Sequence, residues 1–121
     1  MEMLEVEEVD LSGAQVTVLG LARSGIAACH LLSEAGARVT VADRKGEDEL
    51  APVLKSVDRS HVEVSVGAEY ERSLDHADLV VISPGIPYRL EALERVRQRG
   101  IKVISELELA SRFISAPILA V

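Results

Sequence analysis

The chain has 121 residues, of which 48% are hydrophobic and 2% are aromatic, and it carries a formal net charge of −7 at pH 7. This length predicts one domain with a buried core. The acidic balance argues against nucleic acid as a partner, because phosphate binding requires a basic surface. The scarcity of aromatic residues also leaves no platform on which single-stranded bases could stack.

The single cysteine, Cys29, excludes an internal disulfide and a cysteine-based zinc site, so we expect no resident metal. No apolar run approaches the length of a membrane span, and no signal peptide is recognisable before the domain. We therefore expect a cytoplasmic protein that has no membrane partner.

The first structural signal follows an acidic stretch. Residues 1–12 mix glutamates with leucines and valines, which favours a partly ordered lead-in lying across the domain; the alternative is a solvated tail. The apolar run Gln15–Leu19 comes next and predicts a strand that is buried on both faces of a parallel sheet.

That strand ends at Gly20, and Gly25 opens a helix that we expect to run from Ser24 to Ala35. Gly20 and Gly25 have the spacing of the outer glycines in the dinucleotide-binding pattern G-x-G-x-x-G, with Ala22 in place of the middle glycine. A helix that begins here presents free backbone N–H groups and a positive dipole end to an anion. The alternative is a plain strand–helix turn whose glycines only permit close packing.

A second predicted strand, Arg38–Ala42, ends in Asp43 and Arg44. In the nucleotide-binding pattern an acidic residue at this distance lies beside the glycine turn and accepts a hydrogen bond from a ribose or a base. The alternative is a solvated aspartate that closes the strand. Residues 45–60 then have helical spacing of apolar residues, with Pro52 expected in the first turn.

The next two predicted strands differ in character. His61–Val66 alternates valine with polar residues, which indicates an edge strand, whereas Asp78–Ile82 is a continuous apolar run. The second run leads directly into Ser83-Pro84-Gly85-Ile86-Pro87. Ser83 would offer a hydroxyl and Gly85 a close backbone approach at the sheet edge where ligands bind. The alternative is a proline-stiffened loop.

The rest of the chain predicts a helix over Leu90–Arg99, a strand over Ile101–Ile104 and a helix through about Phe113. Ser105 and Glu108 form a capping box for this last helix. Residues 116–121 begin another apolar strand, so we expect the chain to be part of a longer protein.

The alternation of strands and helices predicts an α/β fold, a Rossmann-like open parallel sheet with helices on both faces. Right-handed crossovers then give the strand order 3-2-1-4-5. The candidate site should lie above the carboxyl ends of the first, second and fourth strands.

Four stretches together resemble the N-terminal domain of the Mur ligases over essentially the whole chain. They are the glycine turn 18–25, Asp43, the Ser83–Pro87 element and the closing run 116–121. The Ser-Pro-Gly-Ile-Pro element is similar to that of the members that add D-glutamate in peptidoglycan synthesis.

The resemblance implies that residues 1–115 bind the UDP end of UDP-N-acetylmuramoyl-L-alanine. It implies diphosphate contacts at the glycine turn, uracil contacts at the end of the second strand, and further substrate contacts after the fourth strand. The implied substrate-binding residues are Gly20, Ala22, Arg23, Ser24, Gly25, Asp43, Arg44, Ser83, Pro84 and Gly85. The family often has a small hydroxyl residue where this chain has Arg44.

In the family, the strand that matches residues 116–121 opens an ATP-binding domain. The present sequence contains no G-x-x-x-x-G-K-[ST], so we expect no catalytic residue and no cofactor site in this chain. The resemblance implies that the parent ligase uses ATP, Mg²⁺ and D-glutamate and proceeds through an acyl phosphate. Two alternatives are an NAD-binding domain of an oxidoreductase, which the glycine turn and Asp43 would also suit, and a nucleotide-sensing regulatory module.

Overall fold

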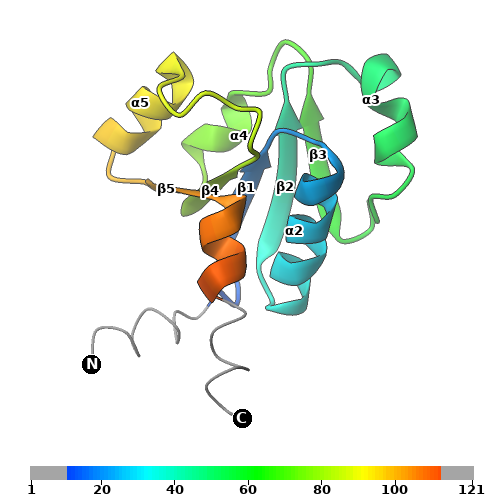
Figure 1. Ribbon diagram of the computed structural model, residues 1–121, viewed down its shortest axis with the longest axis horizontal. Helices are drawn as coiled ribbons and strands as arrows, with labels where there is room; N and C mark the ends of the chain where they lie inside the picture. Colours follow the sequence, from blue (N-terminus) through cyan, green and yellow to red (C-terminus); the bar gives the residue numbers. More distant parts are fainter. Residues whose placement is uncertain (1–10, 113–121) are drawn as a thin grey trace.

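The computed structural model describes residues 11–112, and its centre is a five-stranded parallel sheet (Figure 1). The strand order is β3-β2-β1-β4-β5, which confirms the order and the fold class expected from the sequence. The strands are β1 (Gln15–Leu19), β2 (Arg38–Asp43), β3 (Val62–Val66), β4 (Leu79–Ile82) and β5 (Lys102–Ser105).

The register of the sheet brings three strand ends together. Leu19 at the end of β1 is paired with Ala42 of β2 on one side and with Ile82 of β4 on the other. Asp43, the last residue of β2, and Gly20 and Ser83, which directly follow β1 and β4, therefore lie side by side at the carboxyl edge of the sheet. This edge is where open parallel sheets bind ligands.

Helices cover both faces of the sheet (Figure 1). On one face, α2 (Arg23–Glu34), α3 (Glu47–Leu54) and a helix over 106–112 contribute buried residues to one apolar cluster. On the other face, α4 (Arg72–Asp75) and α5 (Glu91–Gln98) contribute to a second cluster. β1 supplies side chains to both clusters, as expected of a central strand buried on both faces.

Three local predictions differ from the structure. Pro52 lies in the second half of α3 and not in its first turn, because the helix already begins at Glu47 with three acidic residues near its positive end. His61 and Asp78 lie just outside β3 and β4. The Glu108 backbone N–H does bond to the Ser105 hydroxyl as a capping box requires, but the Glu108 carboxylate accepts a hydrogen bond from Arg112.

Several predictions concern residues outside 11–112. These are most of the lead-in 1–12, the end of the last helix at Phe113 and the strand 116–121. Within the described range, no helix has both the length and the apolar character needed to cross a bilayer.

Candidate functional site

A cleft of about 350 Å³ lies at the carboxyl edge of the sheet. Its walls come from the segments that follow β1, β2 and β4, together with Tyr70 and Leu90. The lining residues are Leu19, Gly20, Leu21, Ala22, Asp43, Arg44, Lys45, Tyr70, Ser83, Gly85, Ile86, Pro87 and Leu90. The structure thus brings together six of the ten predicted site residues as direct lining, and they come from all three predicted segments.

Backbone conformation and space both disfavour any residue other than glycine at position 20. Its φ of +98° lies in the left-handed region, and a Cβ there would be 2.9 Å from both the Ser83 Cβ and the Ile86 Cγ1. Gly25 is constrained by space, because a Cβ would lie 2.7 Å from the backbone oxygen of Gly20. Gly25 therefore permits the close approach of helix α2 to the turn after β1, and Gly20 permits the close approach of that turn to the loop after β4.

The first turn of α2 faces this cleft at its Ala22 end. Ala22 is the N-cap, is exposed, and forms no side-chain cap. The first helical hydrogen bond runs from the Ile26 N–H to the Ala22 carbonyl oxygen. The N–H groups of residues 23–25 have no acceptor within the helix, and its first turn holds no acidic residue. For Arg23 and Ser24 the structure describes the backbone alone.

Asp43 ties two of the cleft's loops together. One carboxylate oxygen accepts a hydrogen bond from the Leu21 N–H at 2.8 Å, and the other accepts one from the Lys45 N–H at 2.8 Å. The side chain thus holds the turn after β1 against the turn after β2. Beside it, Arg44 and Lys45 are exposed cations on the rim of the cleft.

Ser83 is turned into the protein. The residue is buried, and its hydroxyl lies 2.5 Å from the Gly20 carbonyl oxygen and 2.5 Å from the Glu106 Oε2. Pro84 and Gly85, by contrast, are exposed. A Cβ at Gly85 would meet nothing within 4 Å and its φ is not positive, so the fold itself does not require glycine there.

The sequence did not indicate two residues of this region, Tyr70 and Glu106. Tyr70 is buried in the cleft wall, and its burial, together with the Glu71 carboxylate, raises the pKa of its phenol. Glu106 is 8% exposed although it stands in a charged stretch of sequence. Neither position carries a local signal, because each is buried by elements that lie far away in the sequence.

Cys29 lies in the core, as expected for a small apolar residue. Cys29 is 1% exposed in the apolar core, and burial, with a smaller contribution from the Glu106 charge, raises the pKa of its thiol to about 12. Among residues 11–112 no group of three or more His, Cys, Asp or Glu side chains is placed to hold a metal ion.

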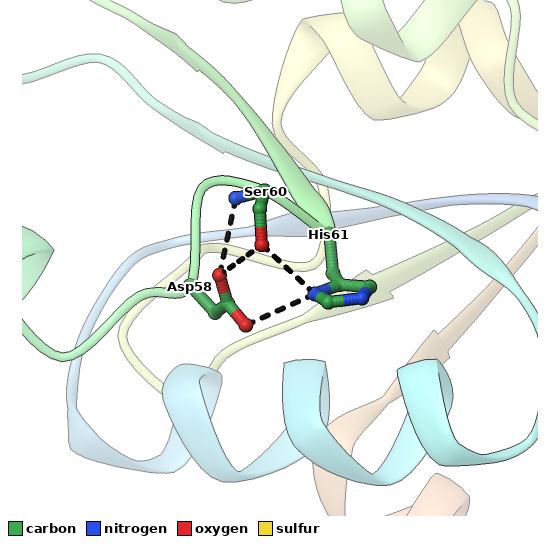
Figure 2. Close-up of polar contacts among 3 residues, drawn as sticks. All are labelled: Asp58, Ser60 and His61. Atoms are coloured by element: carbon green, nitrogen blue, oxygen red, sulfur yellow. Dashed lines mark hydrogen bonds and ion pairs between the residues drawn. The ribbon is translucent and has the colours of Figure 1, made fainter.

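A polar cluster away from the cleft lining, formed by Asp58, Ser60 and His61, has the composition of a catalytic triad but not its geometry (Figure 2). The Ser60 hydroxyl and the Asp58 carboxylate both contact the same His61 nitrogen, Nδ1, at 3.0 and 2.9 Å. A triad needs the serine and the acid on opposite ring nitrogens. Asp58 also accepts hydrogen bonds from the Ser60 hydroxyl and N–H. The hydrogen bond from the Ser60 hydroxyl, followed by those from His61 and the Ser60 N–H, lowers the pKa of Asp58 to about 2. The cluster is an exposed turn that precedes β3.

Residues 14–105 match the model of a protein family described as Mur ligase MurD-like, N-terminal domain. A UDP-N-acetylmuramoylalanine–D-glutamate ligase from Trichlorobacter lovleyi is 41% identical over 113 residues, which are 93% of this chain and 25% of that protein. The ligase of the same name from Anaeromyxobacter dehalogenans is 45% identical over 105 residues, 87% of this chain and 22% of that protein. The chain spans about a quarter of the length of these curated relatives.

Solved structures share the fold at lower identity. Glutamyl-tRNA reductase from Methanopyrus kandleri aligns with a TM-score of 0.59 and 20% identity, covering 94% of this chain and 35% of that one. The dipicolinate synthase A chain from Bacillus subtilis aligns with a TM-score of 0.56 and 19% identity, covering 98% and 51%. At this identity the likeness establishes the Rossmann-like fold and nothing about the ligand.

Proposed function

Because this chain belongs to the family of MurD-like N-terminal domains of Mur ligases, we propose that it binds the UDP end of UDP-N-acetylmuramoyl-L-alanine. The parent protein would be a cytoplasmic, ATP-dependent ligase that adds D-glutamate to this substrate in peptidoglycan synthesis. The relatives named above carry that activity in their names, and this chain corresponds to one quarter of them.

The observation that carries the proposal is the start of helix α2 at the cleft. A diphosphate there would meet the free N–H groups of residues 23–25 and the positive end of the helix dipole. Ala22 presents no side-chain carboxylate or hydroxyl that would compete for these groups. Arg44 and Lys45 add positive charge at the rim of the same cleft, in a chain whose net charge is −7.

The uridine would lie toward Asp43 and Arg44. Each Asp43 oxygen already accepts one backbone N–H, and a carboxylate oxygen has capacity for a second donor. A ribose hydroxyl or the uracil N3–H could supply that donor. On the opposite wall, Gly85 would permit the substrate to approach the backbone closely, while Ser83 would shape the wall from beneath.

The bond-forming chemistry would take place outside this chain. The sequence holds no phosphate-cradling loop with a lysine, so we assign the binding of ATP and Mg²⁺ to the rest of the parent protein. ATP would supply the phosphoryl group that activates the substrate carboxylate in the parent. The part of these residues would be to bind and orient the nucleotide end.

A titration distinguishes this proposal from the NAD-binding and nucleotide-sensing alternatives. Amide chemical shifts of the ¹⁵N-labelled chain would be followed on addition of UDP-N-acetylmuramoyl-L-alanine, UDP, NADH and Mg-ATP in parallel. We expect saturable shifts at Gly20, Gly25 and Asp43 with the two uridine ligands. Stronger binding of NADH would favour the oxidoreductase, and a preference for Mg-ATP over UDP would favour a sensor of adenine nucleotides.

A further inference from the structure

Glu106 is a buried acidic residue outside the cleft lining, and the proposed binding of UDP does not use it directly. It begins the helix over 106–112, directly after β5, and is 8% exposed. Its Oε1 has no hydrogen-bond partner among the residues that the structure describes. Burying a carboxylate with one oxygen unbonded costs free energy. We therefore ask what the hydrogen bond of the other oxygen, Oε2, contributes to the structure.

That contact leads to the turn at which the diphosphate is proposed to bind. Glu106 Oε2 lies 2.5 Å from the Ser83 hydroxyl, which lies 2.5 Å from the Gly20 carbonyl oxygen. The same Oε2 would be 3.5 Å from a Cβ placed on Gly25. One carboxylate oxygen thus lies close to both ends of the Gly20–Gly25 turn, and it reaches the Gly20 end through the Ser83 hydroxyl.

We infer that Glu106 is a positioning residue for the diphosphate-binding turn, acting through the Ser83 hydroxyl on the Gly20 carbonyl. This inference rests on the proposed function and assigns a role to a side chain that does not touch the substrate.

The physical reason is the shared hydroxyl. A serine hydroxyl has one proton and can donate to one acceptor at a time, so the Glu106 Oε2 and the Gly20 oxygen share the single proton of Ser83, and removing the hydroxyl removes both contacts. The carboxylate fixes the Ser83 rotamer, and the hydroxyl in turn limits how far the Gly20 peptide can rotate. The orientation of that peptide sets where the following N–H groups point, and anion binding depends on their direction.

The test is a double-mutant cycle on the affinity for UDP. The variants are Glu106→Ala, Ser83→Ala and the pair combined, with Glu106→Gln as the conservative variant that retains hydrogen bonding to Ser83. Glu108→Ala is the matched control, because Glu108 lies on the same helix, is exposed and pairs with Arg112. Calorimetric titration gives the dissociation constant, and thermal unfolding gives the Tm of each variant.

We expect Glu106→Ala to weaken UDP binding by about 3- to 10-fold, the size of one lost hydrogen bond, with Glu106→Gln restoring most of it and Glu108→Ala unchanged. The combined variant should bind no more weakly than the worse single variant, because both changes break one chain of contacts. Fully additive losses, or a Glu106→Gln variant as weak as Glu106→Ala, would overturn the inference.

A second measurement keeps the inference separate from the proposed function. Amide chemical shifts and hydrogen exchange at Leu21 and Gly25 report the turn without any ligand. Glu106→Ala should move both signals, whereas Glu108→Ala should not. If the unsubstituted 121-residue chain fails to bind UDP, the proposed function is wrong. The amide signals still show, without ligand, whether Glu106 positions the turn. Unmoved signals would overturn the inference on their own.

Discussion

Two polar clusters in this molecule have similar composition and opposite character. Asp58, Ser60 and His61 lie within four consecutive positions and are exposed, whereas Gly20, Ser83 and Glu106 are buried and are joined across separations of 63 and 23 residues. The first cluster is visible in the sequence, and the second exists only after the sheet has formed.

The difference shows which contacts define the candidate site. The exposed cluster satisfies its own backbone in a turn, and water can replace each of its hydrogen bonds. The buried cluster connects the ends of β1 and β4 with the helix that follows β5, and its burial reduces the competition from water. Its loss should therefore affect both stability and the shape of the cleft, and the following changes test that contrast.

The largest expected effect is at Gly25, behind the buried cluster. Gly25→Ala should lower the free energy of unfolding by about 2–3 kcal/mol, because its Cβ would be forced against a backbone oxygen. Gly85→Ala is the matched control, since a Cβ there meets nothing within 4 Å. Its free energy of unfolding should equal that of the unsubstituted chain. Urea denaturation measures both. Equal losses would mean that α2 does not approach the sheet as closely as described.

The two serines provide the direct comparison between clusters. Ser83→Ala should cost about 1–3 kcal/mol, because it removes the one hydroxyl proton that the buried Gly20 carbonyl and the buried Glu106 carboxylate share. Ser60→Ala should stay within about 0.5 kcal/mol, as is usual for exposed positions. The same urea titrations measure the pair. A cost at Ser60 that matches the cost at Ser83 would contradict the distinction drawn between the clusters.

The smallest expected effect is electrostatic and local to the exposed cluster. Hydrogen bonds from Ser60 and His61 hold the pKa of Asp58 at about 2, below its ordinary value of 3.8. Because the folded pKa is the lower one, any stabilisation is present above pH 3.8 and is lost as the pH falls through 2. Ser60→Ala should raise this pKa toward 3.8 in a ¹³C carboxyl titration. Ser56→Ala, an exposed serine outside the cluster, should leave it unchanged.

Much of the fold could be predicted from the sequence because its signals are local. Apolar runs marked the strands, and general rules of handedness then fixed the order that the sheet adopts. Gly20 and Gly25 were identified by spacing, and their contacts explain that spacing sterically.

The inner side of the cleft could not be predicted in the same way. Nothing near Glu106 in the sequence distinguishes it from the exposed Glu108 two residues later. Ser83 was expected to present its hydroxyl to a ligand, but the structure turns that hydroxyl toward Gly20 and Glu106. Such side-chain directions depend on long-range packing that no local pattern encodes.

The central claim, that a diphosphate binds at the start of α2, is tested most directly at Ala22. This N-cap has extended backbone geometry and no side-chain cap, so Ala22→Asp and Ala22→Asn should each stabilise the chain by about 0.5–2 kcal/mol. The two variants differ only in charge. Both caps would compete with the diphosphate for the N–H groups at the start of α2, but only Asp adds a negative charge. We therefore predict that Ala22→Asp binds UDP about 5- to 50-fold more weakly than Ala22→Asn at low salt, with the gap narrowing as salt is added. Equal affinities of the two variants for UDP at low salt would contradict the claim.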